Sequence, residues 1–222
     1  MNPKNAFWQA LFSAVLIFGV GIVLGFNFEN SRNQEIEKNL LNSEINVLDS
    51  QLMSKVNENF NIGCDASREK LIKQADSIYS EAKLLEKYAS SSQITDTLEL
   101  VHKKYDLLRL NLWSESIQLK KRCNFDFNTI VYIYQYAEPS IETKSEQITF
   151  ARVLEDLKIK YGNKFILIPL AGDLKLDSID LMKEAFGIES QPVIIINEKK
   201  VIEDVDSLKE IENFLILRNE SN

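Results

Sequence analysis

The sequence has little of the residue types that most often carry chemistry. Among its 222 residues there are two cysteines and one histidine, and there is no glycine-rich phosphate loop. The lone His102 lies in a helical stretch without a second histidine nearby, which favours a surface residue over a metal ligand or an acid–base catalyst. The net charge of -7, with lysines and arginines interspersed among acids, argues against a nucleic-acid partner. We therefore predict no metal site, no cofactor and no catalytic residue.

One long apolar run stands near the N-terminus. The run from Ala6 to Phe26 has no charged residue, and at 1.5 Å per residue it matches a bilayer core of about 30 Å. It is longer than a signal-peptide core and has no small-x-small cleavage site after it, which favours a retained anchor over a cleaved signal. The sequence thus predicts a transmembrane signal anchor over residues 1–27, in a single-pass protein of the cell membrane. The short leader before the run favours a C-terminal part outside the cytoplasm.

Residues 28–124 are predicted to form a helical stalk followed by an antiparallel helical hairpin. The stalk has no Pro or Gly from Ser31 to Asn59 and carries one apolar stripe at spacings of three and four. The stripe consists of Leu41, Ile45, Leu48, Leu52 and Val56. Two heptads are too few for a coiled coil, so packing on the next helices is favoured, and pairing with a second copy or another chain stays open. The first arm of the hairpin is expected to begin at about Asp65 and to end near Ser90. The second arm is expected from about Thr95 to Lys121.

The hairpin brings the two cysteines together. Cys64 lies just before the first arm and Cys123 just after the second. Counted from a bend near Ser91, the two arms have about 27 and 32 residues and are roughly 40 and 48 Å long, a mismatch that modest tilt or fraying absorbs. The two ends should therefore meet. We predict a Cys64–Cys123 disulfide, which would persist in an oxidising compartment. The alternative is two buried thiols that pack as small apolar groups and never react.

After Cys123 the pattern changes to strands that alternate with helices. Four strands are expected at 127–136, 164–170, 192–197 and 199–204, and helices at 143–162, 176–187 and 206–217. Thr143 with Glu146 is typical of a capping box, and Asp177 and Asp206 are expected to begin the later helices. Gly162 and Gly187 are expected to end the first two helices.

This order of elements resembles the thioredoxin core, over about Phe125 to Leu217. Pro192, which opens the third strand, matches the family's cis-proline, although Gln191 stands where the family usually has Thr or Val. The resemblance implies an α/β thioredoxin-like domain over residues 125–222, in which the last two strands pair as a hairpin and the first three are joined by right-handed crossovers. The family's chemistry depends on a Cys-x-x-Cys motif after the first strand. The loop from Tyr136 to Ser145, where this motif would lie, has no sulfur. Cys123 cannot replace it, because Cys123 comes before the first strand and the length of that strand, roughly 25 Å, separates it from the loop.

The predicted function is that of a membrane-anchored, redox-inactive binding or scaffolding protein with a protein or peptide partner. The resemblance implies a peptide groove, for which the candidate residues are Ala137, Glu138, Pro139, Ser140, Ile141, Gln191 and Pro192. One alternative is a thiol–disulfide redox protein or sensor that uses Cys64 and Cys123. The other is a helical subunit for the assembly of a membrane complex, with homo- or hetero-oligomers formed through the stalk.

Overall fold

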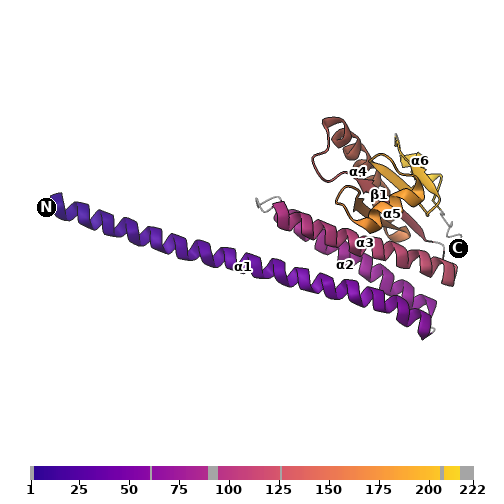
Figure 1. Ribbon diagram of the computed structural model, residues 1–222, viewed down its shortest axis with the longest axis horizontal. Coiled ribbons are helices and arrows are strands. Elements are labelled where there is room, and N and C mark those ends of the chain that lie inside the picture. Colours follow the sequence, from indigo (N-terminus) through magenta and orange to yellow (C-terminus); the bar gives the residue numbers. More distant parts are fainter. Residues whose placement is uncertain (1–2, 61, 90–94, 126, 206–207, 216–222) are drawn as a thin grey trace. The chain divides into compact units, whose positions relative to one another are not determined.

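The computed structural model describes residues 3–60, 62–89, 95–125, 127–205 and 208–215. The chain divides into two compact units, Met1–Asn46 and Val47–Asn222. Helix α1 (Pro3–Asn59) makes up the described part of the first unit and continues into the second (Figure 1). The apolar stripe predicted on it is solvent-exposed, from 41% at Val56 to 61% at Ile45.

The predicted membrane span requires correction. A spanning helix needs about 20 residues with a predominantly apolar surface. Within the residues that the structure describes, no helix is both long enough and apolar enough to cross a membrane. The finding contradicts the transmembrane signal anchor over residues 1–27, the membrane as a partner and the single-pass location in the cell membrane. The fold is mixed α/β, with a four-stranded sheet in the second unit.

Helices α2 (Cys64–Ala89) and α3 (Thr95–Cys123) lie side by side and share an apolar core (Figure 1). Leu71 and Ile78 of α2 pack with side chains of α3 that recur at helical spacing and are at most 6% exposed. These α3 residues are Val101, Tyr105, Leu108, Leu112 and Leu119. A disulfide joins the first residue of α2 to the last residue of α3, with a Cα–Cα distance of 5.7 Å. The pairing is the one predicted for Cys64 and Cys123.

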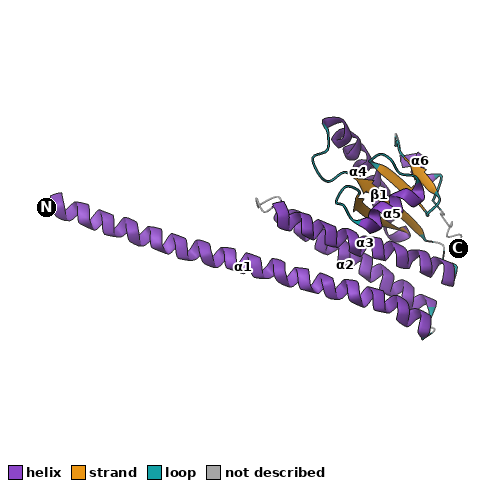
Figure 2. Cartoon of the chain, in the orientation of Figure 1, coloured by secondary structure: helices purple, strands orange, loops and turns teal. Residues whose placement is uncertain are grey.

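The sheet, whose strands are orange in Figure 2, has the strand order β2-β1-β3-β4. Its strands are β1 (Asn128–Tyr134), β2 (Phe165–Ala171), β3 (Val193–Ile196) and β4 (Lys200–Ile202). β1 and β2 are parallel, whereas β3 is antiparallel to both β1 and β4. The expected crossover into a third parallel strand is therefore absent. Gly187 ends α5 in the left-handed conformation (φ 65°), and the chain returns to the carboxyl end of β1, where Val193 pairs with Ile133.

Each face of the sheet is covered by helices. Helices α4 (Ile141–Tyr161) and α6 (Leu208–Glu212) cover the face formed by Ile130, Tyr132 and Ile194. Helix α5 (Asp177–Phe186) and part of α3 cover the opposite face, which carries Val131, Ile133 and Ile195. Alternate residues of β1 and β3 thus point to the two cores, as the pleat requires.

The C-termini of α4 and α5 lie where they were predicted, whereas the N-terminus of α4 does not. The 3₁₀ turn η1 (Gly162–Lys164) follows α4, and Gly162 has a positive φ of 54°. Ser140, not Thr143, caps α4, because its Oγ accepts the Thr143 N–H at 3.1 Å. The predicted capping box was therefore placed one turn too late. The predicted cap Asp206 lies outside the described residues.

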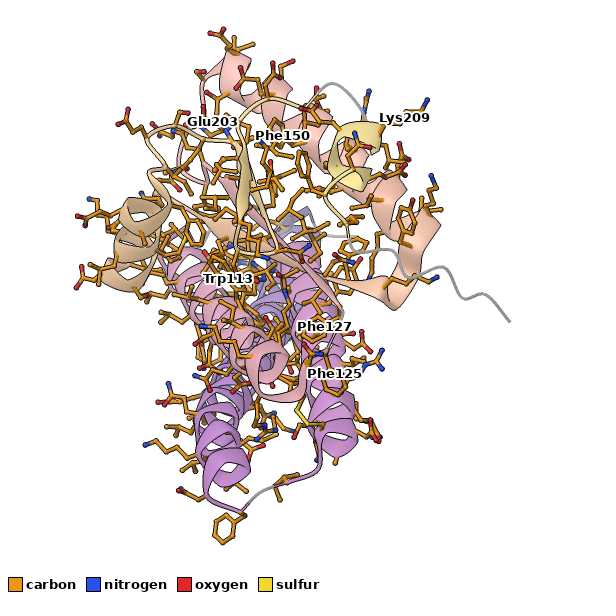
Figure 3. All side chains as sticks on the ribbon, turned by 90° about the vertical axis from the view of Figure 1, so that its right-hand side faces the viewer. Trp113, Phe125, Phe127, Phe150, Glu203 and Lys209 are labelled. Atoms are coloured by element: carbon orange, nitrogen blue, oxygen red, sulfur yellow. A yellow bond between two sulfur atoms is a disulfide. The ribbon has the colours of Figure 1, made fainter. Side chains whose placement is uncertain are left out.

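Helix α3 also lies along the sheet. Asp106, Trp113 and Lys120 recur every seven residues, and each contacts the sheet or the turn after β3. Fourteen helical residues rise about 21 Å, which is close to the length of a seven-residue strand at about 3.3 Å per residue. The three side chains therefore follow the sheet from the carboxyl end of β2 to the amino end of β1. Figure 3 shows Trp113 between the hairpin and the sheet.

Candidate functional site

The candidate site lies where β1 and β2 end. Tyr134 and Ala171, the last residues of the two parallel strands, are paired. Pro192 enters β3 at the same edge, because Val193 pairs with Ile133. The loop after β1, the turn after β2 and the segment before β3 are thus neighbours. In open sheets with parallel strands, the carboxyl ends of the strands are where ligands usually bind.

The loop after β1 is held from two sides. Asp173 accepts the N–H groups of Tyr136 and Ala137, at 2.8 Å and 2.7 Å, through its two carboxylate oxygens. The side-chain amide of Gln147 on α4 accepts from the Gln135 N–H at 2.9 Å and donates to the Gln135 carbonyl at 3.3 Å. Gln147 therefore replaces the strand partner that the end of β1 lacks. Together these four bonds fix the backbone that leads into the predicted groove residues.

Gln191 packs tightly against the turn after β2. The Gln191–Pro192 peptide bond is cis. A Cβ atom at Gly172 would lie only 2.6 Å from Cδ and 2.8 Å from Oε1 of Gln191, so the Gln191 amide occupies the space that any larger residue at Gly172 would need. The Oε1 atom is buried and has no hydrogen-bond partner within the described chain. On the other side, Lys183 donates to the Gly172 carbonyl at 2.6 Å.

Helix α3 places a buried carboxylate behind this edge. Asp106 is 0% exposed, accepts the Ala171 N–H at 3.1 Å and pairs with Arg109 at 3.2 Å. Burial raises the pKa of Asp106 to about 6, against the opposing effect of Arg109 and the Ala171 N–H. One turn earlier, His102 lies against the ring of Tyr136 with a centroid distance of 4.3 Å. The pKa of Tyr136 is raised by burial and by the carboxylates of Glu99, Asp106 and Asp173.

The same carboxylate protects an edge strand. β2 is at the border of the sheet, where unpaired backbone N–H groups would be open to other chains. Pro169 has no N–H to offer, and the N–H of Ala171 is taken by Asp106. α3 thus covers part of this border, and the hairpin contributes a residue, Asp106, to the edge of the sheet where the candidate site lies.

Five of the predicted groove residues, Ala137 to Ile141, follow the carboxyl end of β1, and we call this stretch the lip. Ala137, Glu138, Ser140 and Ile141 are exposed and Pro139 is half-buried, whereas Gln191 is half-buried and Pro192 is buried. Ile141 is 92% exposed, although it is a large apolar side chain at the start of α4. The Ser140 hydroxyl is engaged as the helix cap and lies 2.9 Å from the Thr143 hydroxyl. The lip is therefore an exposed surface whose serine hydroxyl is engaged by the backbone of α4.

The disulfide lies at the other end of the sheet. Cys123 precedes β1, and the seven residues of that strand separate it from the lip by about 23 Å. Cys64 and Cys123 are therefore not placed to take part in chemistry at the lip. Figure 3 shows the bridge beside Phe125, below the sheet.

Several residues of the site were not predicted from the sequence. Asp106, Asp173 and Gly172 all shape it, and His102 was expected at the surface but is half-buried against Tyr136. The seven-residue spacing of Asp106, Trp113 and Lys120 was the available signal. These three residues lie beside the apolar stripe of α3. Their spacing indicates a second face of the helix that packs on another part of the protein.

The chain matches no protein-family model and no curated protein sequence. Among the described residues, no group of three or more His, Cys, Asp and Glu side chains is placed to hold a metal ion. Function therefore has to be inferred from what the edge itself offers: a fixed loop, an exposed apolar side chain and a buried amide oxygen.

Proposed function

We propose that the sheet and its helices form a thioredoxin-like binding module that holds a segment of another protein without dithiol chemistry. The order of strands and helices and the proline at the start of the third strand support the family resemblance. The loop that would carry the dithiol has no sulfur. Because fold resemblance alone is a weak basis for function, the proposal depends on the properties of the lip.

The observation that carries the proposal is a large apolar side chain exposed on a fixed frame. Ile141 is 92% exposed. It begins α4 directly after the loop that Asp173 and Gln147 hold by hydrogen bonds to Tyr136, Ala137 and Gln135. A surface that is ordered before binding loses less entropy on binding, and a buried apolar anchor commonly contributes much of the binding energy. The lip is thus suited to an extended protein segment with an apolar side chain.

Site-specific photocrosslinking tests the proposal. A photoreactive residue replaces Ile141 in one variant and Ile159 in the matched control, because Ile159 is 78% exposed on the same helix but near its other end. We expect a crosslinked partner from Ile141 and little from Ile159. Equal yields from the two positions, or no product from Ile141, would remove the lip as a binding surface.

A double-mutant cycle at Gly172 and Gln191 tests whether the crosslinking yield depends on the packing between these two residues. Gly172→Ala should displace the Gln191 amide, because the new Cβ would overlap it. We expect the variant to lower the Ile141 crosslinking yield and to cost about 1 kcal/mol of unfolding free energy. In a Gln191→Ala background the same change should cost little, since the overlapping atoms are gone. Additive effects in the cycle would show that Gly172 and Gln191 act separately.

A further inference from the structure

We propose that the Cys64–Cys123 disulfide is a redox-controlled latch: it holds α2 on α3, and its reduction by a dithiol frees α2 while α3 stays on the sheet. The inference is separate from the proposed binding function. It concerns the other end of the molecule, where the bridge closes the open end of the hairpin.

Helix α3 has attachments that do not depend on α2. At one end Asp106 accepts the Ala171 N–H, and at the other Lys120 donates to the Thr129 hydroxyl at 2.7 Å and to Glu198 at 3.1 Å. Between them, Trp113 packs in the sheet core and donates to Glu198 at 2.8 Å. α3 is therefore fixed along the whole length of the sheet.

Helix α2 is held mainly by α3. Its large buried apolar side chains in the described chain are Leu71 and Ile78, and both belong to the core shared with α3. Polar links also join the helices, among them the bonds that Tyr105 donates to Glu81 at 3.1 Å and that Arg122 donates to the Ser67 hydroxyl at 2.9 Å. The rest of the described α2 surface is largely exposed, including Tyr79 at 65%. Segments with few buried apolar contacts are the first to open locally.

The bridge is open to attack by a thiol. Cys64 and Cys123 are both half-buried, and Ile62 and Gly63 beside them are exposed. Lys121 and Arg122, next to Cys123, are exposed cations that attract a thiolate. Cys64 is the first residue of α2, where the helix N-terminus stabilises a negative charge, so Cys64 is the better leaving group.

The reaction consumes one dithiol for each bridge. A thiolate of the dithiol attacks Sγ of Cys123, the S–S bond breaks, and its electron pair leaves on Sγ of Cys64, which takes up a proton. The second thiol of the dithiol, as its thiolate, then attacks the dithiol's own sulfur in the mixed disulfide; the bond to Sγ of Cys123 breaks, and Cys123 leaves as a thiolate that takes up a proton. The dithiol is oxidised to a disulfide, and the protein gains two electrons and two protons.

Reduction would uncover the apolar row of α3. Leu108 and Leu112 are 0% and 2% exposed with α2 in place. They lie in the row that runs from Val101 to Leu119. Freed of α2, this row would be a contiguous apolar surface, which is the kind of surface that binds an amphipathic helix.

Hydrogen exchange followed by mass spectrometry tests the latch on the full chain. The oxidised protein is compared with protein reduced by dithiothreitol in native buffer, with thiol labelling to verify reduction. We expect amide exchange in α2 to accelerate by about tenfold or more, whereas β1 and β3 exchange as before. Three results would overturn the latch: a bridge that resists dithiothreitol, unchanged exchange in α2, or equal acceleration of α2 and β1.

A relinked protein separates loss of the bridge from other effects of the reductant. After reduction, a one-carbon thioether is formed between the thiols of Cys64 and Cys123, which dithiothreitol cannot cleave. We expect this protein to regain slow exchange in α2 with the reductant still present. Fast exchange in the relinked protein would contradict the latch, because the covalent tie would then not be what holds α2.

Discussion

The two arms of the hairpin differ in how many of their faces are buried. α2 and α3 have 26 and 29 residues and are tied by the same disulfide. α2 buries one face, against α3, whereas α3 buries one face against α2 and a second against the sheet. α3 is thus an integral part of the sheet's core. The comparison shows that covalent pairing and similar length do not make two helices equivalent, because stability follows the surface that each one buries.

The second face of α3 carries several polar groups beside the apolar Trp113, which is unusual for a buried surface. Asp106 and Ser116 are 0% exposed. Asp106 bonds to Ala171, Ser116 donates to the Trp113 carbonyl at 2.6 Å, and Lys120 pairs with Glu198. Buried polar groups are costly unless they are bonded, so such a set tolerates few alternative registers. We infer that the bonds of Asp106 to Ala171 and of Lys120 to Glu198 set the register of α3 along the sheet, while apolar packing and the disulfide hold α2.

The largest effect is expected at Trp113, on the sheet side of α3. Trp113 is 3% exposed, stacks on Phe186 at 5.6 Å and donates to Glu198. Trp113→Ala should lower the free energy of unfolding by about 3–5 kcal/mol, through a cavity and the loss of the hydrogen bond to Glu198. Urea denaturation measures the change, and Tyr79→Ala on the exposed side of α2 is the control, with little effect expected. A loss below about 1 kcal/mol at Trp113 would mean that α3 does not depend on the sheet.

The next effect is a pH dependence that belongs to Asp106. Its folded pKa is about 6, raised from 3.8, so the folded state binds the proton more tightly than the unfolded state. Below about pH 3 both states are protonated and the contribution is fully present. As the pH rises toward 6 and above, stability is lost, by about 3 kcal/mol at 1.36 kcal/mol per pKa unit.

The measurement is urea denaturation of wild type and Asp106→Asn at several values between pH 3 and 7. The wild type should lose about 3 kcal/mol more than the variant across this range. Arg109 pairs with Asp106, and Arg109→Gln should raise the pKa of Asp106 further and strengthen the dependence. Parallel curves for wild type and Asp106→Asn would show that Asp106 does not titrate in this range.

Much of the C-terminal fold follows from local sequence. The structure has β1 and β3 within the expected β-branched runs, because continuous apolar stretches of that length suit strands buried on both faces. Gly162 and Gly187 lie at the helix ends because they adopt a positive φ. The antiparallel course of β3 was missed, since strand direction depends on where the chain returns after α5.

What could not be predicted depends on pairs distant in sequence. Asp106 needs Ala171, and Gly172 needs Gln191, so neither role appears in a local pattern. The apolar run at residues 6–26 was correctly expected to be helical, since α1 covers it, but the expectation that it spans a bilayer was wrong, because no helix of the described residues is long and apolar enough to do so. Of the site, the lip and Pro192 came from the family resemblance. The fixed frame behind them came only from the structure.

The smallest effect is expected at the polar link between the two arms. Tyr105 is 5% exposed and donates its hydroxyl to Glu81 on α2. In the oxidised protein Tyr105→Phe should lower the free energy of unfolding by about 0.5–1.5 kcal/mol, because one hydrogen bond is lost while the ring still packs. In the reduced protein the cost should disappear, since an α2 that has left α3 no longer offers Glu81. Urea denaturation of both proteins, oxidised and reduced, measures the two values. Equal costs in the two redox states would show that α2 remains on α3 without the bridge.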